Sequence, residues 1–236
     1  MTQHVLLIGN GPSGESHTLT TIREMAGDFD RIARCNHFYV GENFGRHVDD
    51  LFFAVDNESL FSGIYSSITS GKKSVQRFMT PLQSTRLGFL TYLDVEIINF
   101  WRFLLEDDYF SSIYIRGSNH KLPTTGMQAL HYYLTQGVKI FSVVGIDFYT
   151  SQNRYAFSRE VNSRRLGDFN VIGYEDKAHS KQDDFLYFLH LAKKYDFTVN
   201  VLSAPAPWDE LRSLTRQFGC RGATFKFCRA RLEAAE

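Results

Sequence analysis

The chain has few cysteines, no long apolar run and no net charge. Its three cysteines, Cys35, Cys220 and Cys228, are odd in number and lack metal-ligand spacing, which predicts reduced thiols in a cytoplasmic protein. The apolar stretch at residues 5–8 is too short for a signal peptide and has no basic start, and no apolar run is long enough to span a bilayer. Lysine and arginine total 26, as do aspartate and glutamate, so no basic field indicates a nucleic-acid partner.

Length and hydrophobic content nevertheless predict a globular protein. The 236 residues suit one domain, or one domain with a small insert. Hydrophobic residues make up 43% of the chain, enough for a core, and aromatic residues reach 15%. We expect some of these aromatic side chains in the core and some around a pocket.

A glycine-rich loop follows the first predicted strand, residues 4–9. The loop Gly9-Asn-Gly-Pro-Ser-Gly14 fits the spacing G-x-G-x-x-G, in which glycines let the backbone approach a phosphate. That motif expects an acidic residue at the end of the second strand, where this chain has Asn36. A flavin or nicotinamide oxidoreductase is therefore a weaker alternative, and a tight turn without a ligand is another.

An amide side chain lies at the end of each of the first three predicted strands, at residues 4–9, 31–36 and 49–56, or directly after it. The three residues are Asn10, Asn36 and Asn57. Ligands of open parallel sheets lie beyond the carboxyl ends of the strands, and asparagine offers both a donor and an acceptor. Turn chemistry alone also favours asparagine at such positions. The repetition predicts a site for a base, a ribose or a phosphate.

In the middle of the chain we expect further strands at residues 74–80 and 95–100. A helix is expected at 100–109, with the acidic residues 106–108 on a solvated face. A helix at 127–136 has Thr125 as its expected N-cap, whose hydroxyl and neighbouring amides could also receive an anion. A helix beginning near Asp183 and a last strand at 197–202 follow. The basic, aromatic tail at 212–231 suits either an anionic membrane surface or a solvated terminal helix.

The stretch from Val138 to Lys181 organises the prediction of function. A buried strand ends at Gly145 and is followed by Tyr149, Tyr155 and, just ahead of a helix, His179. Residues 150–180 are polar and lack apolar periodicity, which predicts a lid over the sheet edge. We expect an α/β fold, a Rossmann-like, mostly parallel sheet with helices on both faces, formed by residues 1–149 and 182–236 with a lid insert at 150–181.

Four blocks of residues make the chain resemble the bacterial CMP-sialic-acid-dependent sialyltransferases of glycosyltransferase family 42, which decorate lipooligosaccharide. The blocks occur in the family's order and cover most of the chain up to about residue 202. They are Gly9-Asn-Gly-Pro-Ser13, Asp28-Phe-Asp30 through Cys35-Asn36-His-Phe-Tyr39, Thr124-Thr-Gly126 through Gly145-Ile-Asp-Phe-Tyr149, and Tyr155-Ala-Phe157 with His179-Ser-Lys181.

The resemblance implies a role for each site residue, with no metal and no cofactor beyond the donor CMP-sialic acid. The residues that would hold CMP are Asn10, Gly11, Ser13, Asn36 and Asn57, with Thr125 where the family has a serine that touches the donor. Tyr149 and Tyr155 would bond the leaving phosphate, and His179 would be the general base. The chain departs from the family pattern at Leu122, where the family has an arginine. This difference bears on acceptor binding or on activity itself.

These residue types suit sialyl transfer with inversion. Histidine titrates near neutral pH and can take the acceptor's proton, and two phenols can stabilise the leaving phosphate. Asp28-Phe-Asp30 fits a metal-binding Asp-x-Asp motif by letter, but it precedes the second strand, so we expect it at the amino end of the sheet. Partners would be a CMP-sugar and a glycan or glycolipid acceptor, with peripheral contact to the inner membrane and self-association as further expectations. A non-catalytic CMP-sugar-binding protein is the remaining alternative.

Overall fold

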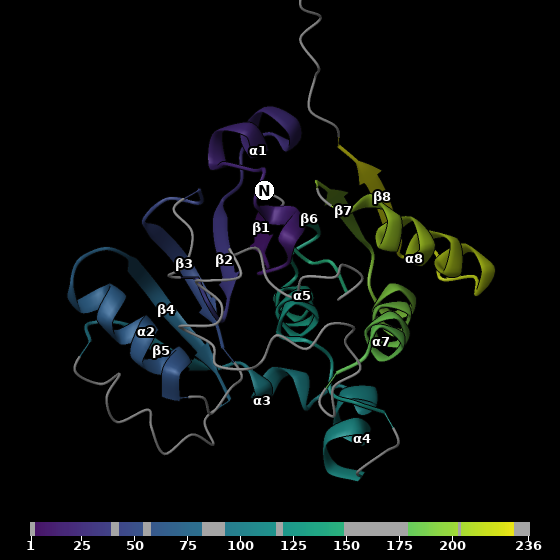
Figure 1. The fold of residues 1–236 in the computed structure, drawn as a ribbon. Coiled ribbons are helices and arrows are strands. Elements are labelled where there is room, and N and C mark those ends of the chain that lie inside the picture. The colour runs from purple at the N-terminus through teal and green to yellow at the C-terminus, as the bar shows by residue number, and fades with distance from the viewer. Residues whose placement is uncertain are drawn as a thin grey trace, which may run out of the picture.

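A single eight-stranded sheet forms the centre of the protein (Figure 1). Every strand pair in it is parallel, in the order β5-β4-β3-β2-β1-β6-β7-β8. The computed structural model describes residues 3–38, 43–53, 58–81, 93–116, 120–148, 179–202 and 204–228. The mostly parallel α/β fold expected from the sequence is confirmed.

The strands are short and, toward the centre of the sheet, almost fully buried. Their bounds are β1 His4–Ile8, β2 Arg31–Cys35, β3 His47–Phe52, β4 Ser74–Thr80, β5 Glu96–Asn99, β6 Ile140–Val144, β7 Phe197–Val201 and β8 Ala223–Phe227. Strands covered by helices on both faces carry continuous apolar runs, and Val5 to Ile8 of β1 are all 0% exposed.

Helices connect the strands and cover both faces of the sheet (Figure 1). Their bounds are η1 Pro12–Gly14, α1 Leu19–Ala26, α2 Glu58–Thr69, α3 Trp101–Leu104, α4 Asp108–Arg116, α5 Thr125–Thr135, α7 Lys181–Lys194 and α8 Pro205–Gln217. Side chains of α1 and α2 pack on one face of the sheet, and those of α3, α5, α7 and α8 join the large cluster on the other.

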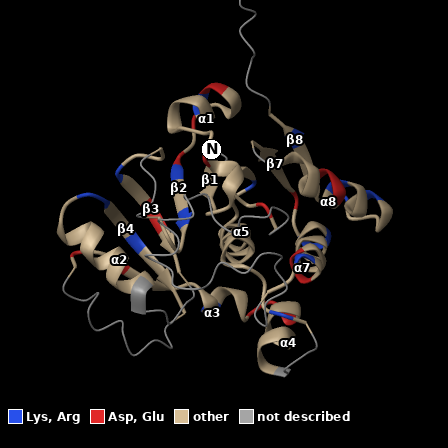
Figure 2. Cartoon of the chain, in the orientation of Figure 1, with Lys and Arg blue, Asp and Glu red and all other residues tan. Residues whose placement is uncertain are grey.

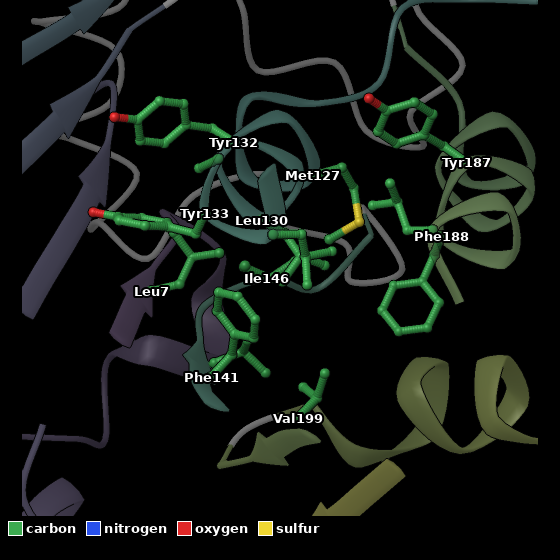
Figure 3. Packing of buried hydrophobic residues seen from close by; sticks show 14 of the residues in the cluster. Leu7, Met127, Leu130, Tyr132, Tyr133, Phe141, Ile146, Tyr187, Phe188 and Val199 are labelled. Carbon is green, nitrogen blue, oxygen red and sulfur yellow. The ribbon is translucent and has the colours of Figure 1, made fainter. Parts of the chain in front are cut away.

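Helix α5 is the central element of the larger cluster. Its residues contain no Lys, Arg, Asp or Glu, and Figure 2 shows it without a charged segment. All positions from Thr125 to Leu134 are buried. Figure 3 shows Met127 and Leu130 between Phe141 of the sheet and Phe188 of α7. A helix without charged side chains that is buried along its length must be enclosed, so α5 is held between the sheet and its neighbouring helices.

Three expectations about individual elements are wrong. The helix expected at 100–109 is divided into α3 and α4, because the Asp107 carboxylate accepts the backbone N–H groups of Tyr109 and Phe110 and starts a new helix there. Asp107 is 2% exposed rather than solvated. β7 is not the last strand, because the tail forms β8, in which Phe225 and Phe227 pack against the core instead of lying on a solvated helix.

Candidate active site

The sheet has its topological switch point between β1 and β6, where successive strands turn to opposite sides. Backbone hydrogen bonds join the two strand ends: Gly9 N–H donates to Val144 O at 2.8 Å and Gly11 N–H to Gly145 O at 2.7 Å. A Cβ on Gly9 would lie 2.2 Å from the Gly145 oxygen. Glycine at position 9 therefore serves the close approach of two protein strands.

The loop after β1 is held by a carboxylate that sequence reasoning did not single out. Asp147, which follows β6, accepts the Ser13 backbone N–H at 2.9 Å and also the Ser13 hydroxyl. Burial raises the pKa of the Asp147 carboxyl above its ordinary value, although both hydrogen bonds from Ser13 lower it. A carboxylate beside loop amides that already donate within the protein disfavours a phosphate here and favours a neutral group.

Two asparagines lie at neighbouring strand ends. Asn10 Nδ2 donates to the Cys35 carbonyl at 2.6 Å, and Asn36 Nδ2 donates to Thr125 Oγ1 at 3.3 Å. The Oδ1 atoms of Asn10 and Asn36 are buried and have no hydrogen-bond partner among the described residues. Buried acceptors without partners are costly, so this edge of the sheet suits a ligand that brings N–H or O–H donors.

A buried arginine stabilises the turn that contains Asn36. Asn36 has φ of 48°, and Phe38 N–H donates to its carbonyl. Arg34, 2% exposed, donates from Nη1 to the Phe38 carbonyl at 2.9 Å, and its guanidinium lies over the Phe44 ring. Burial lowers the pKa of Arg34 to about 10. These tertiary contacts thus stabilise the positive-φ backbone conformation of Asn36.

Helix α5 begins beside Asn36. Its N-cap is Thr124, whereas the sequence predicted Thr125. The Thr124 side chain makes no cap hydrogen bond. Its hydroxyl and its backbone N–H instead donate to the Asp184 carboxylate at 2.9 and 2.8 Å. Burial raises the pKa of Asp184 to about 7, although the Thr124 hydrogen bonds lower it. The first-turn amides of α5 therefore lack a side-chain cap, which suits an anionic ligand.

His179 lies close to the same helix end. Its Nδ1 is 2.8 Å from the carbonyl oxygen of Leu122, and its own carbonyl accepts Lys121 Nζ at 3.4 Å. Because a carbonyl only accepts, Nδ1 carries the proton of the neutral ring and Nε2 carries the lone pair. The Leu122 side chain packs against the core, so this residue serves the histidine through its backbone.

Several predicted site residues lie outside the described part of the chain: Asn57, Tyr149, Tyr155 and most of the expected lid. Phe148, the residue before Tyr149, has φ of 50° and packs between the rings of Phe185 and Trp208 at 5.0 and 4.9 Å. A bulky residue at positive φ marks strain, which gathers at functional sites.

Other candidate sites receive less support. Asp30 accepts the His4 backbone N–H at the amino end of β1, so the Asp-x-Asp sequence lies where the sequence predicted, away from the strand ends that carry the asparagines. Among the described residues, no group of three or more His, Cys, Asp or Glu side chains is arranged to hold a metal ion. No described helix combines the length and apolarity needed to cross a membrane.

Solved structures with a similar fold exist, although neither a protein-family model nor a curated protein matches the sequence. The monofunctional alpha-2,3-sialyltransferase Cst-I from Campylobacter jejuni matches with a TM-score of 0.64 at 20% identity, over 86% of this chain and 76% of its own. The sialyltransferase CstII from the same organism, solved with the substrate analogue CMP-3FNeuAc, matches with a TM-score of 0.60 at 21% identity, over 85% and 81%.

A third structure, the sialyltransferase CST-II in complex with a trisaccharide acceptor and CMP, has a TM-score of 0.59 at 22% identity. The match covers 84% of this chain and 80% of that one. The eight-stranded parallel sheet and its helices therefore form the fold of the Campylobacter jejuni sialyltransferases.

Proposed function

We propose that this protein is a sialyltransferase, which moves sialic acid from CMP-sialic acid to a hydroxyl group of a galactose-terminated glycan. The observation that carries the proposal is that one end of α5 contacts both halves of the expected site. Thr125 contacts Asn36 of the candidate donor site, and Leu122, three residues earlier, accepts the ring N–H of His179. The fold shared with sialyltransferases solved with CMP and a CMP-sugar analogue supports the choice of donor.

The chemistry of the strand ends suggests how CMP would lie. The buried Oδ1 atoms of Asn10 and Asn36 accept hydrogen bonds, and cytosine and ribose offer N–H and O–H donors. The Asp147 carboxyl group, which already accepts the backbone N–H and hydroxyl of Ser13, favours the neutral nucleoside over a phosphate at Gly11 and Ser13. The uncapped N-terminus of α5 at Thr125 then suits the phosphate or the sialic-acid carboxylate.

In the proposed reaction, the acceptor oxygen forms a bond to the anomeric carbon while the bond from that carbon to the phosphate oxygen of CMP breaks. The bonding electrons leave with CMP, and Nε2 of His179 takes the acceptor's proton. Tyr149 and Tyr155 stabilise the departing phosphate, an electrostatic role that needs no metal. Attack from the face opposite the leaving group inverts the configuration.

A transfer assay with CMP-sialic acid and galactose-terminated acceptors tests the proposal. We expect His179→Ala to lower kcat at least about 100-fold, because a positioned general base contributes about that much or more. His47→Ala is the matched control, since the His47 side chain is 57% exposed and lies at the amino end of β3, away from the strand ends that carry the asparagines. Tight CMP binding without any release of CMP from CMP-sialic acid would instead identify a non-catalytic binding protein.

Two expectations accompany this function. We propose a glycan or glycolipid as the acceptor, as in the trisaccharide complex of CST-II. We also propose cytoplasmic localisation, from the odd number of cysteines, peripheral contact to the inner membrane, from the basic and aromatic tail at 212–231, and self-association, from the family resemblance. A nicotinamide oxidoreductase is disfavoured, because the ribose of the cofactor would lie beside Asn36 where such enzymes have an acidic residue. Asn36 already donates a hydrogen bond to Thr125.

A further inference from the structure

Two segments far apart in the sequence are joined beside the candidate base. We call them the clasp: residues 120–124, which lead into α5, and residues 179–184, which begin α7. The contacts are His120 Nδ1 to Asp183 Oδ1 at 2.9 Å, Lys121 Nζ to His179 O at 3.4 Å, His179 Nδ1 to Leu122 O at 2.8 Å, and Thr124 N and Oγ1 to Asp184 at 2.8 and 2.9 Å.

Asp184 is the buried contact of the clasp. The residue is 1% exposed, whereas the side chain of His120 is 46% exposed. Both carboxylate oxygens of Asp184 are used by one residue, Thr124, through its backbone N–H and its hydroxyl. This pair of hydrogen bonds fixes both the backbone and the side-chain rotamer of Thr124, two residues after Leu122 and one before Thr125.

We propose that Asp184 is a positioning residue for sugar transfer, which holds the backbone of residues 122–125 so that the Leu122 carbonyl aims the His179 imidazole at the substrate. The inference rests on the proposed function and deepens it. Asp184 is assigned no contact with the substrate and acts through Leu122 and His179. Loss of the Thr124 anchor would displace the base and the start of α5 together.

A simpler role for Asp184 would be to complement the dipole of α7. An acidic side chain in a first turn stabilises a helix, but it does so best when it faces the free amides of that helix. Asp183 lies in the same turn and already accepts the Ser180 hydroxyl at the N-cap. Dipole complementation also does not require a buried carboxylate that points at another helix. The contact with Thr124 therefore indicates a role at α5.

Three variants separate positioning from general stability. Asp184→Ala removes both hydrogen bonds to Thr124. Asp184→Asn keeps an oxygen that can accept the Thr124 N–H. Asp107→Ala is the matched control, because Asp107 is equally buried and also accepts backbone amides at a helix start, but it contacts His190 and Lys194 toward the other end of α7.

Steady-state kinetics with CMP-sialic acid, together with calorimetric titration of CMP, provide the readout. We expect Asp184→Ala to lower kcat about 100-fold, the cost of misplacing a reacting group by about 1 Å. CMP affinity should fall less than kcat does, because Asn10 donates to the Cys35 carbonyl rather than to α5 and keeps its position. Asp184→Asn should restore kcat to within about fivefold of wild type, and Asp107→Ala should lose stability while it keeps kcat.

An Asp184→Ala variant with wild-type kcat, or with a loss that only follows its melting temperature as in Asp107→Ala, would overturn the proposal. A second measurement does not depend on turnover: the imidazole nitrogen signals of His179 in a long-range proton–nitrogen NMR spectrum. We expect one tautomer, protonated at Nδ1, in the wild type and a mixture in Asp184→Ala. Should the wild type transfer no sugar, the proposed function fails, while unchanged His179 signals in the variant would separately refute the positioning role.

Discussion

A buried carboxylate lies near each end of helix α7, and the two have opposite surroundings. Asp107, beside the last turns, accepts hydrogen bonds from Lys194 and His190 at 2.7 and 3.0 Å as well as from two backbone amides. Asp184, in the first turn, accepts hydrogen bonds from the neutral backbone N–H and hydroxyl of Thr124. Within the described part of the chain, Asp107 has cationic hydrogen-bond partners and Asp184 has none.

The pKa values of the two groups follow these surroundings. Burial raises the pKa of Asp107, but the hydrogen bonds from His190, Lys194 and Phe110 outweigh it and hold the pKa well below its usual range. Burial of Asp184 prevails over its hydrogen bonds, so the pKa rises to about 7. The end of α7 away from the candidate site is thus built for stability. The end beside His179 keeps a costly group, as functional sites often do.

The largest expected effect is the pH dependence of the free energy of unfolding that arises from Asp184. Its folded pKa of about 7 exceeds the value of about 3.9 in an unfolded chain, so the folded state binds a proton more tightly and wild-type stability falls as pH rises from about 4 to about 7. Three pKa units set an upper limit of about 4 kcal/mol on this loss. Asp184→Asn removes this titration, so the variant should gain stability relative to wild type over that range. Urea unfolding at pH 5 and pH 8 measures it, and parallel pH profiles would contradict the assignment.

Asp107→Ala should have a smaller effect, with the opposite pH dependence. At pH 7 we expect a loss of about 3 kcal/mol, toward the low end for removing one partner of a buried ion pair, because Lys194 and His190 are partly exposed. The folded pKa of Asp107 lies below its unfolded value, so its contribution is present above about pH 4 and is lost as pH falls toward the folded pKa. Guanidinium or urea unfolding at pH 7 and pH 3 should therefore show a difference that shrinks in acid. An equal difference at both pH values would contradict the lowered pKa of Asp107.

Local sequence patterns predicted the framework of the fold well. β1 and β4 occupy the expected positions, and the amide side chains of Asn10 and Asn36 follow strands as the alternation of apolar runs and turn residues indicated. β8 was missed because its residues alternate between partly buried and exposed positions at the sheet edge, beside basic residues typical of a solvated tail. The strand exists because it pairs with β7.

The contacts that organise the candidate site were harder to predict, because they join residues distant in the sequence. Asp107 resembled a solvated acid, and its cationic partner Lys194 is 87 positions away. Thr124, the N-cap of α5, is held by Asp184, which lies 60 positions later. The role of Asp147 at Ser13 likewise depends on the neighbouring positions of β1 and β6 in the sheet. No periodicity within either segment reports such pairs.

The most direct test of the whole account is a crystal structure of the protein with CMP. We predict that the nucleotide lies beyond the carboxyl ends of β1 and β2, with donors of the nucleoside about 2.7–3.2 Å from the Oδ1 atoms of Asn10 and Asn36 and with its phosphate toward Thr125 and His179. CMP bound elsewhere on the protein, or with these two oxygens still lacking partners, would contradict this prediction.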